Sequence, residues 1–229
     1  MSRLITLIVS LALLIGVDVR LTPVRHNPTL KLDFPVNHIA IVSDSYTTGT
    51  DEGGLGPKNW TARAWQTLAH QGAPISADVE AEGGAGYGTR GNRGSVFEDL
   101  TAKAVSKDDK LVVFFGSRND QGVDPARLSI LAYGTFQLAR SIAPKARILV
   151  IGPAWPTADP PNDVLKIRDA LNYEAGVAGA VFIDPIAAGW FVGRPELIGA
   201  DGVHPTDAGH AYLAEKIAPL IDAQLLRQI

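Results

Sequence analysis

The sequence of 229 residues contains no cysteine. This absence excludes disulfide bonds, a thiolate nucleophile, a zinc site built on thiolates and lipid attachment at an N-terminal cysteine. An excess of one charge is also lacking, because 21 basic side chains balance 24 acidic ones to a formal net charge of −3. Nucleic-acid-binding proteins normally present a strongly basic surface, so we expect no nucleic-acid partner.

The motif Gly-x-Ser-x-Gly is absent as well. Its absence argues against the strand-turn-helix elbow that carries the nucleophile of the α/β-hydrolases. Residues 86–91 match Gly-x-Gly-x-x-Gly, the pattern of a dinucleotide-binding loop, but more Gly and Asn follow where a helix should begin. We therefore expect no nucleotide cofactor.

One apolar segment stands out at the N-terminus. Residues 4–17 follow the basic Arg3 and are mostly apolar over about fourteen positions, the size of a signal-peptide core. No convincing small-x-small cleavage site follows, so an uncleaved membrane anchor is an alternative, and a buried first helix or strand is a third. The sequence thus predicts export, with the protein either secreted or anchored at the outer face of the cytoplasmic membrane or in the cell envelope.

The remainder of the chain is long enough for one well-buried domain. We expect residues 1–22 to form the signal peptide or anchor, residues 23–36 to form a linker bounded by prolines, and residues 37–229 to form the folded domain. Attachment to a membrane through the N-terminal segment is possible in this arrangement.

Strand-like and helix-like patterns alternate along this domain. Apolar runs predict strands at His38–Val42, Ile75–Ala81, Leu111–Phe115, Ile148–Ile151 and Ala180–Ile183. Helical spacing predicts helices at Asn59–Gln71, Val96–Val105, Pro125–Ser141, Asn162–Ala175 and Thr206–Leu226. The alternation is typical of right-handed crossovers and a mostly parallel sheet covered on both faces, so we predict an α/β domain of three layers, α/β/α.

Three short polar motifs lie far apart in the chain: residues 43–45, 116–120 and 201–204. The first two follow predicted strands and the third precedes the final helix. Ligands of open parallel sheets bind outside the carboxyl ends of the strands, so we expect the motifs to meet there.

Together the motifs contain the groups needed for acyl transfer. A serine hydroxyl becomes a good nucleophile when a histidine takes its proton and a carboxylate orients that histidine. We therefore predict Ser45 as the nucleophile, His204 as the base and Asp201 as the orienting carboxylate. A purely structural role for each polar group is the alternative.

An oxyanion hole completes the predicted site. The Asn119 side chain, the Ser45 amide and one glycine amide from the loop after the second strand would donate to the developing negative charge. Gly84 is favoured as that glycine, with Gly86 second, and Asp120 is expected to hold the loop.

In this order, the motifs resemble those of the SGNH (GDSL-type) hydrolases: Gly-Asp-Ser, an isolated Gly, Gly-x-Asn-Asp and Asp-x-x-His, over roughly residues 38–220. The resemblance implies a flavodoxin-like fold and a metal-independent serine esterase, lipase or acyl hydrolase. Two positions depart from the family pattern. Ser43 stands where Gly is usual, in a turn that serine tolerates, and Gly116 lies one residue further from Asn119, which leaves open the backbone amide that lines the hole.

A metal site formed by Asp201, His204 and His210 is a weaker interpretation. No His-Glu-x-x-His element supports it, and Ser45 and Asn119 would have no role. We expect His210 to be a structural residue of the last helix, and we expect no cofactor.

The identity of the substrate is left open by the sequence. A small-molecule, lipid or acylated-carbohydrate ester would suit the site, and a sugar or lipid hydroxyl could replace water as the acyl acceptor. A carbohydrate-binding module without turnover is a third possibility. We expect the glycine-rich loop that begins at Gly83 and residues 152–161, with Trp155, to form the walls of the cleft. Arg90, Arg93 and Arg118 could bind an anionic or sugar group, although solvated loop charges are the simpler interpretation.

Overall fold

The computed structural model describes residues 35–226. The predicted signal peptide or anchor and nearly all of the predicted linker lie outside the described residues. Five parallel strands form one sheet in the order β2-β1-β3-β4-β5, the flavodoxin-like order. The strands are β1 (Asn37–Ser43), β2 (Ile75–Ala81), β3 (Leu111–Phe115), β4 (Arg147–Ile151) and β5 (Val181–Ile183).

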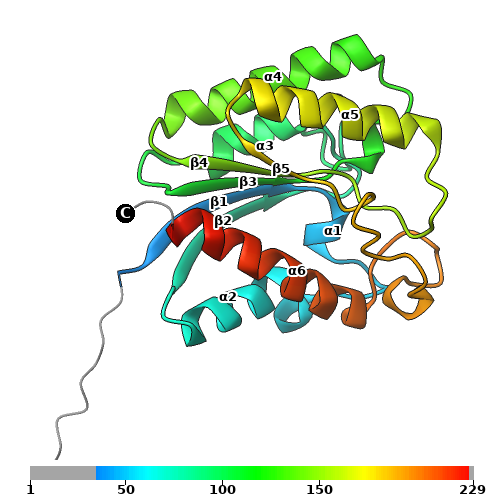
Figure 1. Cartoon of the computed structure of the whole chain (residues 1–229), viewed down its shortest axis with the longest axis horizontal. Coiled ribbons are helices and arrows are strands. Elements are labelled where there is room, and N and C mark those ends of the chain that lie inside the picture. Colours follow the sequence, from blue (N-terminus) through cyan, green and yellow to red (C-terminus); the bar gives the residue numbers. More distant parts are fainter. Residues whose placement is uncertain (1–34, 227–229) are drawn as a thin grey trace, which may run out of the picture. The chain divides into compact units, whose positions relative to one another are not determined.

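Helices cover both faces of the sheet, so the predicted three-layer α/β/α architecture is confirmed (Figure 1). One face carries α3 (Phe97–Ala104), α4 (Pro125–Ile142) and α5 (Asn162–Val177), and the other carries α2 (Trp60–His70) and α6 (Asp207–Leu226). The ends of these five helices agree with the predicted ranges to within two residues. The short helices α1 (Ser45–Thr48), η1 (Gly56–Lys58), η2 (Arg118–Asp120) and η3 (Pro195–Leu197) were not predicted.

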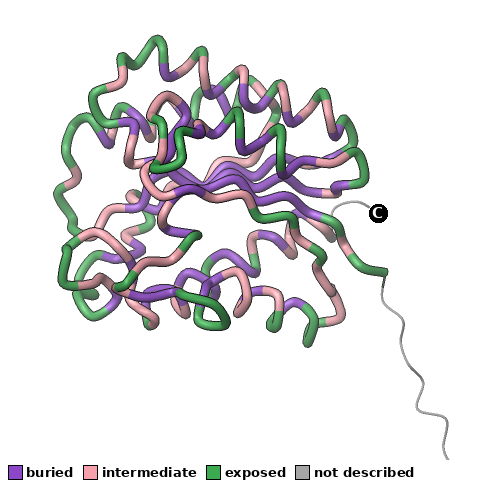
Figure 2. Tube along the Cα trace, turned by 180° about the vertical axis from the view of Figure 1, so that it is seen from behind, coloured by how far each residue is buried: buried purple, intermediate pink, exposed green. Residues whose placement is uncertain are grey.

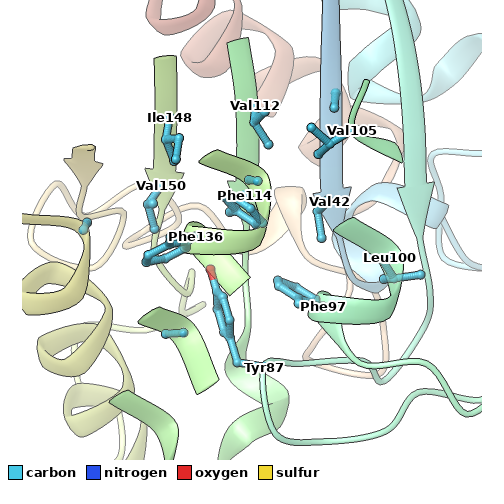
Figure 3. Close-up of a cluster of buried hydrophobic side chains, with 14 of the residues drawn as sticks. Val42, Tyr87, Phe97, Leu100, Val105, Val112, Phe114, Phe136, Ile148 and Val150 are labelled. Carbon is cyan, nitrogen blue, oxygen red and sulfur yellow. The ribbon is translucent and has the colours of Figure 1, made fainter. Parts of the chain in front are cut away.

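The core lies on both sides of the sheet because alternate strand residues point to opposite faces. Val42 and Phe114 pack toward α3 and α4 together with Phe97 and Phe136 (Figure 3). Ile41 and Val113 belong to the cluster on the other face. Burial on both faces explains why the strands read as continuous apolar runs. Figure 2 shows the buried strands between helices whose outer turns are exposed.

Segments that follow the carboxyl ends of the strands lie at one edge of the sheet. β1 is followed by Asp44 and α1, β2 leads into the glycine-rich loop (residues 82–96), and β3 leads into η2. The long segment after β5 returns the chain toward the same edge, where residue 198 pairs with residue 205 in an isolated bridge before α6 begins. Within residues 35–226, none of the helices combines the length and the apolar character needed to cross a bilayer.

Candidate active site

Ser45 is the first residue of α1, directly after β1. Asp44 caps this short helix, because its Oδ1 accepts a hydrogen bond of 2.9 Å from the Tyr46 amide. The first N–H groups of a helix have no partner within the helix, and in the described part of the chain the Ser45 amide has no acceptor. The half-buried Ser45 therefore offers both a hydroxyl and a free N–H at the sheet edge.

His204 lies beside this serine, although 159 positions separate the two in sequence. Its Nε2 is 3.0 Å from the Ser45 Oγ, and its Nδ1 is 2.5 Å from the Asp201 Oδ2. The other carboxylate oxygen of Asp201 accepts from the amides of Val203 and His204. The structure thus brings the three predicted residues together in one hydrogen-bonded chain.

The charge of Asp201 is well stabilised. Partial burial opposes ionisation, but the hydrogen bonds from the His204 ring and from the backbone amides outweigh it and lower the pKa of Asp201 to about 2. The carboxylate stays ionised near neutral pH. It can therefore hold the imidazole with Nδ1 as the donor and Nε2 turned toward Ser45.

The two glycines proposed for the oxyanion hole are placed differently. Gly84 lines the cavity beside Ser45, adopts a φ of +79° and has an amide without an acceptor in residues 35–226. Gly86 instead lies behind the loop, where a Cβ would collide with Asp120 and Ser117. Of the two glycines, Gly84 is the one that lines the cavity.

Asn119 lines the same cavity, but its side chain is already engaged. The Nδ2 donates to the Ala85 carbonyl at 2.9 Å and to the Asp44 Oδ2 at 3.3 Å. These bonds fix the amide group above the end of β1. The bond to Asp44 is the longer and therefore the weaker of the two.

Two buried carboxylates hold the glycine-rich loop from opposite ends. The Asp120 oxygens accept from the amides of Tyr87, Gly88 and Thr89, at 2.8–2.9 Å, which confirms the expected role in holding the loop. Near the start of the loop, the Glu82 Oε1 accepts from the Arg93 and Ser95 amides. The position of Gly84 is thus set by hydrogen bonds that span up to 33 residues.

Ser43 does not occupy a turn, contrary to our expectation. It is the last residue of β1 and is fully buried. Its hydroxyl donates to the Phe115 carbonyl at 2.8 Å and accepts from Thr47 at 2.7 Å, and Thr47 accepts from the Trp60 indole. Serine therefore supplies a link between β1, β3 and α1 that glycine would lack.

Gly116 also differs from a hole-lining residue. Its amide donates to the Ile151 carbonyl, so this N–H is not available to a ligand. A Cβ at this position, where φ is +130°, would lie 2.8 Å from the Asp44 Oδ2. Glycine is required here because Asp44 approaches the backbone closely.

Asp44 is a titratable group that the sequence did not single out. Burial raises its pKa to about 7, although the Tyr46 amide and the nearby cation of Arg118 act in the opposite direction.

His210 is likewise fully buried, and its Nδ1 accepts from the Trp60 amide at 3.3 Å. Burial lowers the pKa of His210 to about 4, in agreement with a structural role. Across residues 35–226, no three His, Cys, Asp or Glu side chains converge as metal ligands would.

The cavity beside Ser45 has a volume of about 490 Å³. Its walls come from four segments, namely the α1 region, the glycine-rich loop, η2 and the segment before α6: Ser45, Thr48, Gly49, Thr50, Gly83, Gly84, Asn92, Arg93, Arg118, Asn119, Val203 and His204. The expected contribution of the glycine-rich loop is present. No residue of the segment 152–161 lines the cavity, and Trp155 instead stacks on Arg118, with 4.2 Å between the guanidinium carbon and the ring centre.

Residues missed by sequence reasoning include Thr48, Thr50, Asn92 and Glu82. The first three line the cavity but belong to no recognisable motif. Glu82 is an acidic residue at the end of a strand, and only its burial shows that it organises a loop. Their roles depend on contacts that local sequence patterns do not encode.

A parallel sheet whose strand ends present a serine beside a histidine is the arrangement of a serine hydrolase, and comparisons with known proteins agree. The family model described as "GDSL-like Lipase/Acylhydrolase family" matches residues 44–212. The chain belongs to this family, and it is a serine hydrolase of ester bonds.

Similar proteins include one with high sequence identity to the chain and others that share mainly its fold. A GDSL lipase of Mycobacterium tuberculosis, Rv0518, is 61% identical over 231 residues, which cover 99% of this chain and 100% of that protein. The solved structure of TesA superposes with a TM-score of 0.67 at 22% identity and covers 82% of this chain and 99% of its own. The lipase/acylhydrolase of Enterococcus faecalis superposes with a TM-score of 0.64 at 18% identity and covers 82% and 96%. These two structures support the fold.

Proposed function

We propose that the protein hydrolyses carboxylic esters through an acyl-enzyme formed on Ser45. The observation that carries the proposal is the chain from the Ser45 Oγ through His204 to Asp201, with contacts of 3.0 and 2.5 Å. His204 removes the hydroxyl proton as Ser45 attacks the carbonyl carbon, and it returns this proton to the departing alcohol. A water molecule then attacks the acyl-enzyme with His204 again acting as the base.

The oxyanion of the tetrahedral intermediate would be stabilised by three donors. The free amides of Ser45 and Gly84 are two of them. Asn119 would be the third if its Nδ2 exchanged the longer bond to Asp44, at 3.3 Å, for the oxyanion. Burial raises the pKa of Asp44 to about 7. When Asp44 is protonated, the exchange is favoured because the charge-assisted hydrogen bond to the oxyanion is stronger than the neutral bond that it replaces. Loss of one such donor typically lowers the rate on the order of 10²- to 10³-fold.

A short and polar ester fits the cavity best. Apart from Val203, the side chains in its wall are polar, charged or small. A long acyl chain would leave water for these polar groups without an apolar surface to cover it. We therefore propose a small-molecule or acylated-carbohydrate substrate rather than a long-chain lipid.

Covalent labelling tests the proposed nucleophile. A fluorophosphonate probe should add once to the wild type, as measured by intact mass, and should not add to Ser45→Ala or His204→Ala. Ser141→Ala is the matched control, because Ser141 is an exposed serine of α4 and should not alter labelling. Adduct formation on Ser45→Ala at the wild-type rate would refute the assignment.

We further propose that the domain acts outside the cytoplasmic membrane. The basic start and apolar segment of residues 1–22 support export. Fusion of residues 1–36 to a reporter that is active only after export should give activity, whereas a fusion lacking residues 1–22 should not. The mass of the exported product distinguishes a cleaved signal peptide from a retained anchor.

A further inference from the structure

Three arginines were candidates for binding an anionic or sugar group, and the structure places them in different environments. Arg90 does not line the cavity; its guanidinium lies 3.6 Å from Asp99 and donates to the Gly94 carbonyl. Arg93 lines the cavity, but it donates to the Ala81 carbonyl and lies 3.8 Å from Glu82. Both arginines therefore have partners in β2, in α3 or in the loop between them.

Arg118 lines the cavity together with Ser45 and His204, and its side chain hydrogen-bonds to the Tyr46 hydroxyl rather than to a carboxylate. In residues 35–226, no carboxylate lies within ion-pair distance of its guanidinium. Its Nη1 is shielded from solvent and has no hydrogen-bond partner. A partly desolvated cation without a counter-ion is costly, so a negatively charged ligand would be favoured at this place.

The surroundings of Arg118 restrict its movement. The guanidinium stacks on the Trp155 ring at 4.2 Å and lies beside the Tyr46 hydroxyl. Stacking of this kind leaves the edge of the guanidinium plane free to donate. An arginine fixed in this way loses little conformational entropy when it binds an anion, and its planar fork matches a carboxylate or phosphate.

Asp44 does not serve as the counter-ion of Arg118, because the two side chains do not form an ion pair. The positive charge of Arg118 lowers the pKa of Asp44, but Asp44 is buried and already accepts hydrogen bonds from Tyr46 and Asn119. It lies beneath the cavity and does not line it. The charge of Arg118 is thus available to a ligand that enters beside Ser45.

We propose that Arg118 forms an anion-binding subsite, so that the preferred substrates are esters that carry a carboxylate or phosphate near the scissile bond. This inference rests on the proposed esterase function and specifies its substrate class. The anionic group can belong to the acyl part or to the alcohol part, because Arg118 and the Ser45 hydroxyl line the same cavity from different segments. Charge recognition also explains why the cavity wall is polar.

Two matched substrate pairs test the proposal. Mono-4-nitrophenyl glutarate and 4-nitrophenyl pentanoate differ by a charge on the acyl side, whereas 4-acetoxybenzoate and its methyl ester differ by a charge on the alcohol side. Each ester is measured with the wild type, Arg118→Gln and Arg118→Lys. Comparing the enzymes on one ester cancels the intrinsic reactivity of that ester. Arg90→Gln is the control, because Arg90 is an arginine of the neighbouring loop outside the cavity.

In at least one pair, Arg118→Gln should lower kcat/KM for the anionic ester about 10- to 100-fold more than for the neutral ester, as expected for loss of a charge-assisted contact. For the anionic ester, the kcat/KM of Arg118→Lys should lie between the values of the wild type and Arg118→Gln, and the kcat/KM of Arg90→Gln should match the wild type. Equal losses for both members of both pairs would overturn the proposal and assign Arg118 to the support of Asn119.

A second measurement does not depend on a variant. Glutarate should inhibit wild-type hydrolysis of the neutral 4-nitrophenyl ester competitively, whereas glutaramide, the uncharged analogue, should inhibit at least tenfold more weakly. Equal inhibition by the two compounds would count against the subsite. If the wild type hydrolysed none of the four esters and failed to bind the fluorophosphonate probe, the esterase proposal itself would fail.

Discussion

The two sides of the candidate active site are built in different ways. On the side of Asn119 and Gly84, buried carboxylates fix the chain through bonds between residues far apart in sequence, as Asp120 does with Tyr87. On the side of His204, the chain is more exposed, and Asp201 makes its bonds within three residues. This difference implies that the first side is coupled to global stability, whereas the second can be altered without unfolding the domain.

Asp201→Asn should give the largest effect, and it should act on activity. An asparagine can still accept from the backbone amides, but it cannot hold the charged imidazole, so we expect kcat to fall about 10³- to 10⁴-fold. The free energy of unfolding should change by less than about 1 kcal/mol, because the side chain is partly exposed. Ester hydrolysis and urea unfolding measure the two quantities.

Asp159→Asn is the control, because Asp159 is an exposed aspartate outside the cavity. The contrast between the two sides would be wrong if Asp201→Asn lowered the free energy of unfolding by as much as it raised the activation free energy of hydrolysis.

Asp120→Ala should act on stability. Removal of this fully buried carboxylate leaves three backbone amides without an acceptor, and each unsatisfied buried group costs about 1 kcal/mol or more. We expect a loss of about 3 kcal/mol in urea unfolding, accompanied by a loss of activity because Gly84 moves. Asp124→Ala removes an exposed helix cap nearby and should cost only about 1 kcal/mol. Similar losses in the two variants would show that burial of Asp120 adds nothing.

His210 should make stability depend on pH. Its pKa is lowered by burial to about 4, against an ordinary value of about 6.5. As pH falls, His210 in the unfolded chain therefore binds a proton at a higher pH than His210 in the folded protein. The free energy of unfolding falls as pH falls from about 6.5 to 4, by at most about 3 kcal/mol. Denaturation at several pH values should show a smaller acid loss in His210→Gln than in the wild type or in His70→Gln, which alters an exposed histidine. Parallel curves for all three would refute this origin.

Tyr46→Phe should give the smallest effect. The Tyr46 hydroxyl donates to the Val203 carbonyl at 2.7 Å and joins α1 to the segment that carries His204. Its loss should cost about 1 kcal/mol of stability and should lower kcat only a few-fold, because Asp201 still orients His204. Urea unfolding measures the stability, and hydrolysis of a neutral ester measures kcat. A fall in kcat comparable to that of Asp201→Asn would show that His204 is positioned mainly by its link to α1.

The sequence by itself determined the five strands, the five long helices, the order of the layers and the residues that meet at Ser45. Strands buried on both faces are apolar throughout, so Leu111–Phe115 was recognisable without tertiary information. The motifs lie next to strand and helix ends, and parallel strands bring such ends to one edge. The predicted proximity of Ser45, His204 and Asp201 follows from this rule.

Only the tertiary structure decided between candidates of the same residue type. It placed Gly84 in the cavity and Gly86 behind the loop, and it distinguished Arg118 from the paired Arg90. It also showed Ser43 as a buried link between strands. These outcomes depend on burial and on bonds between distant residues. A single sequence cannot specify them, because the same side chain is solvated in one loop and desolvated in another.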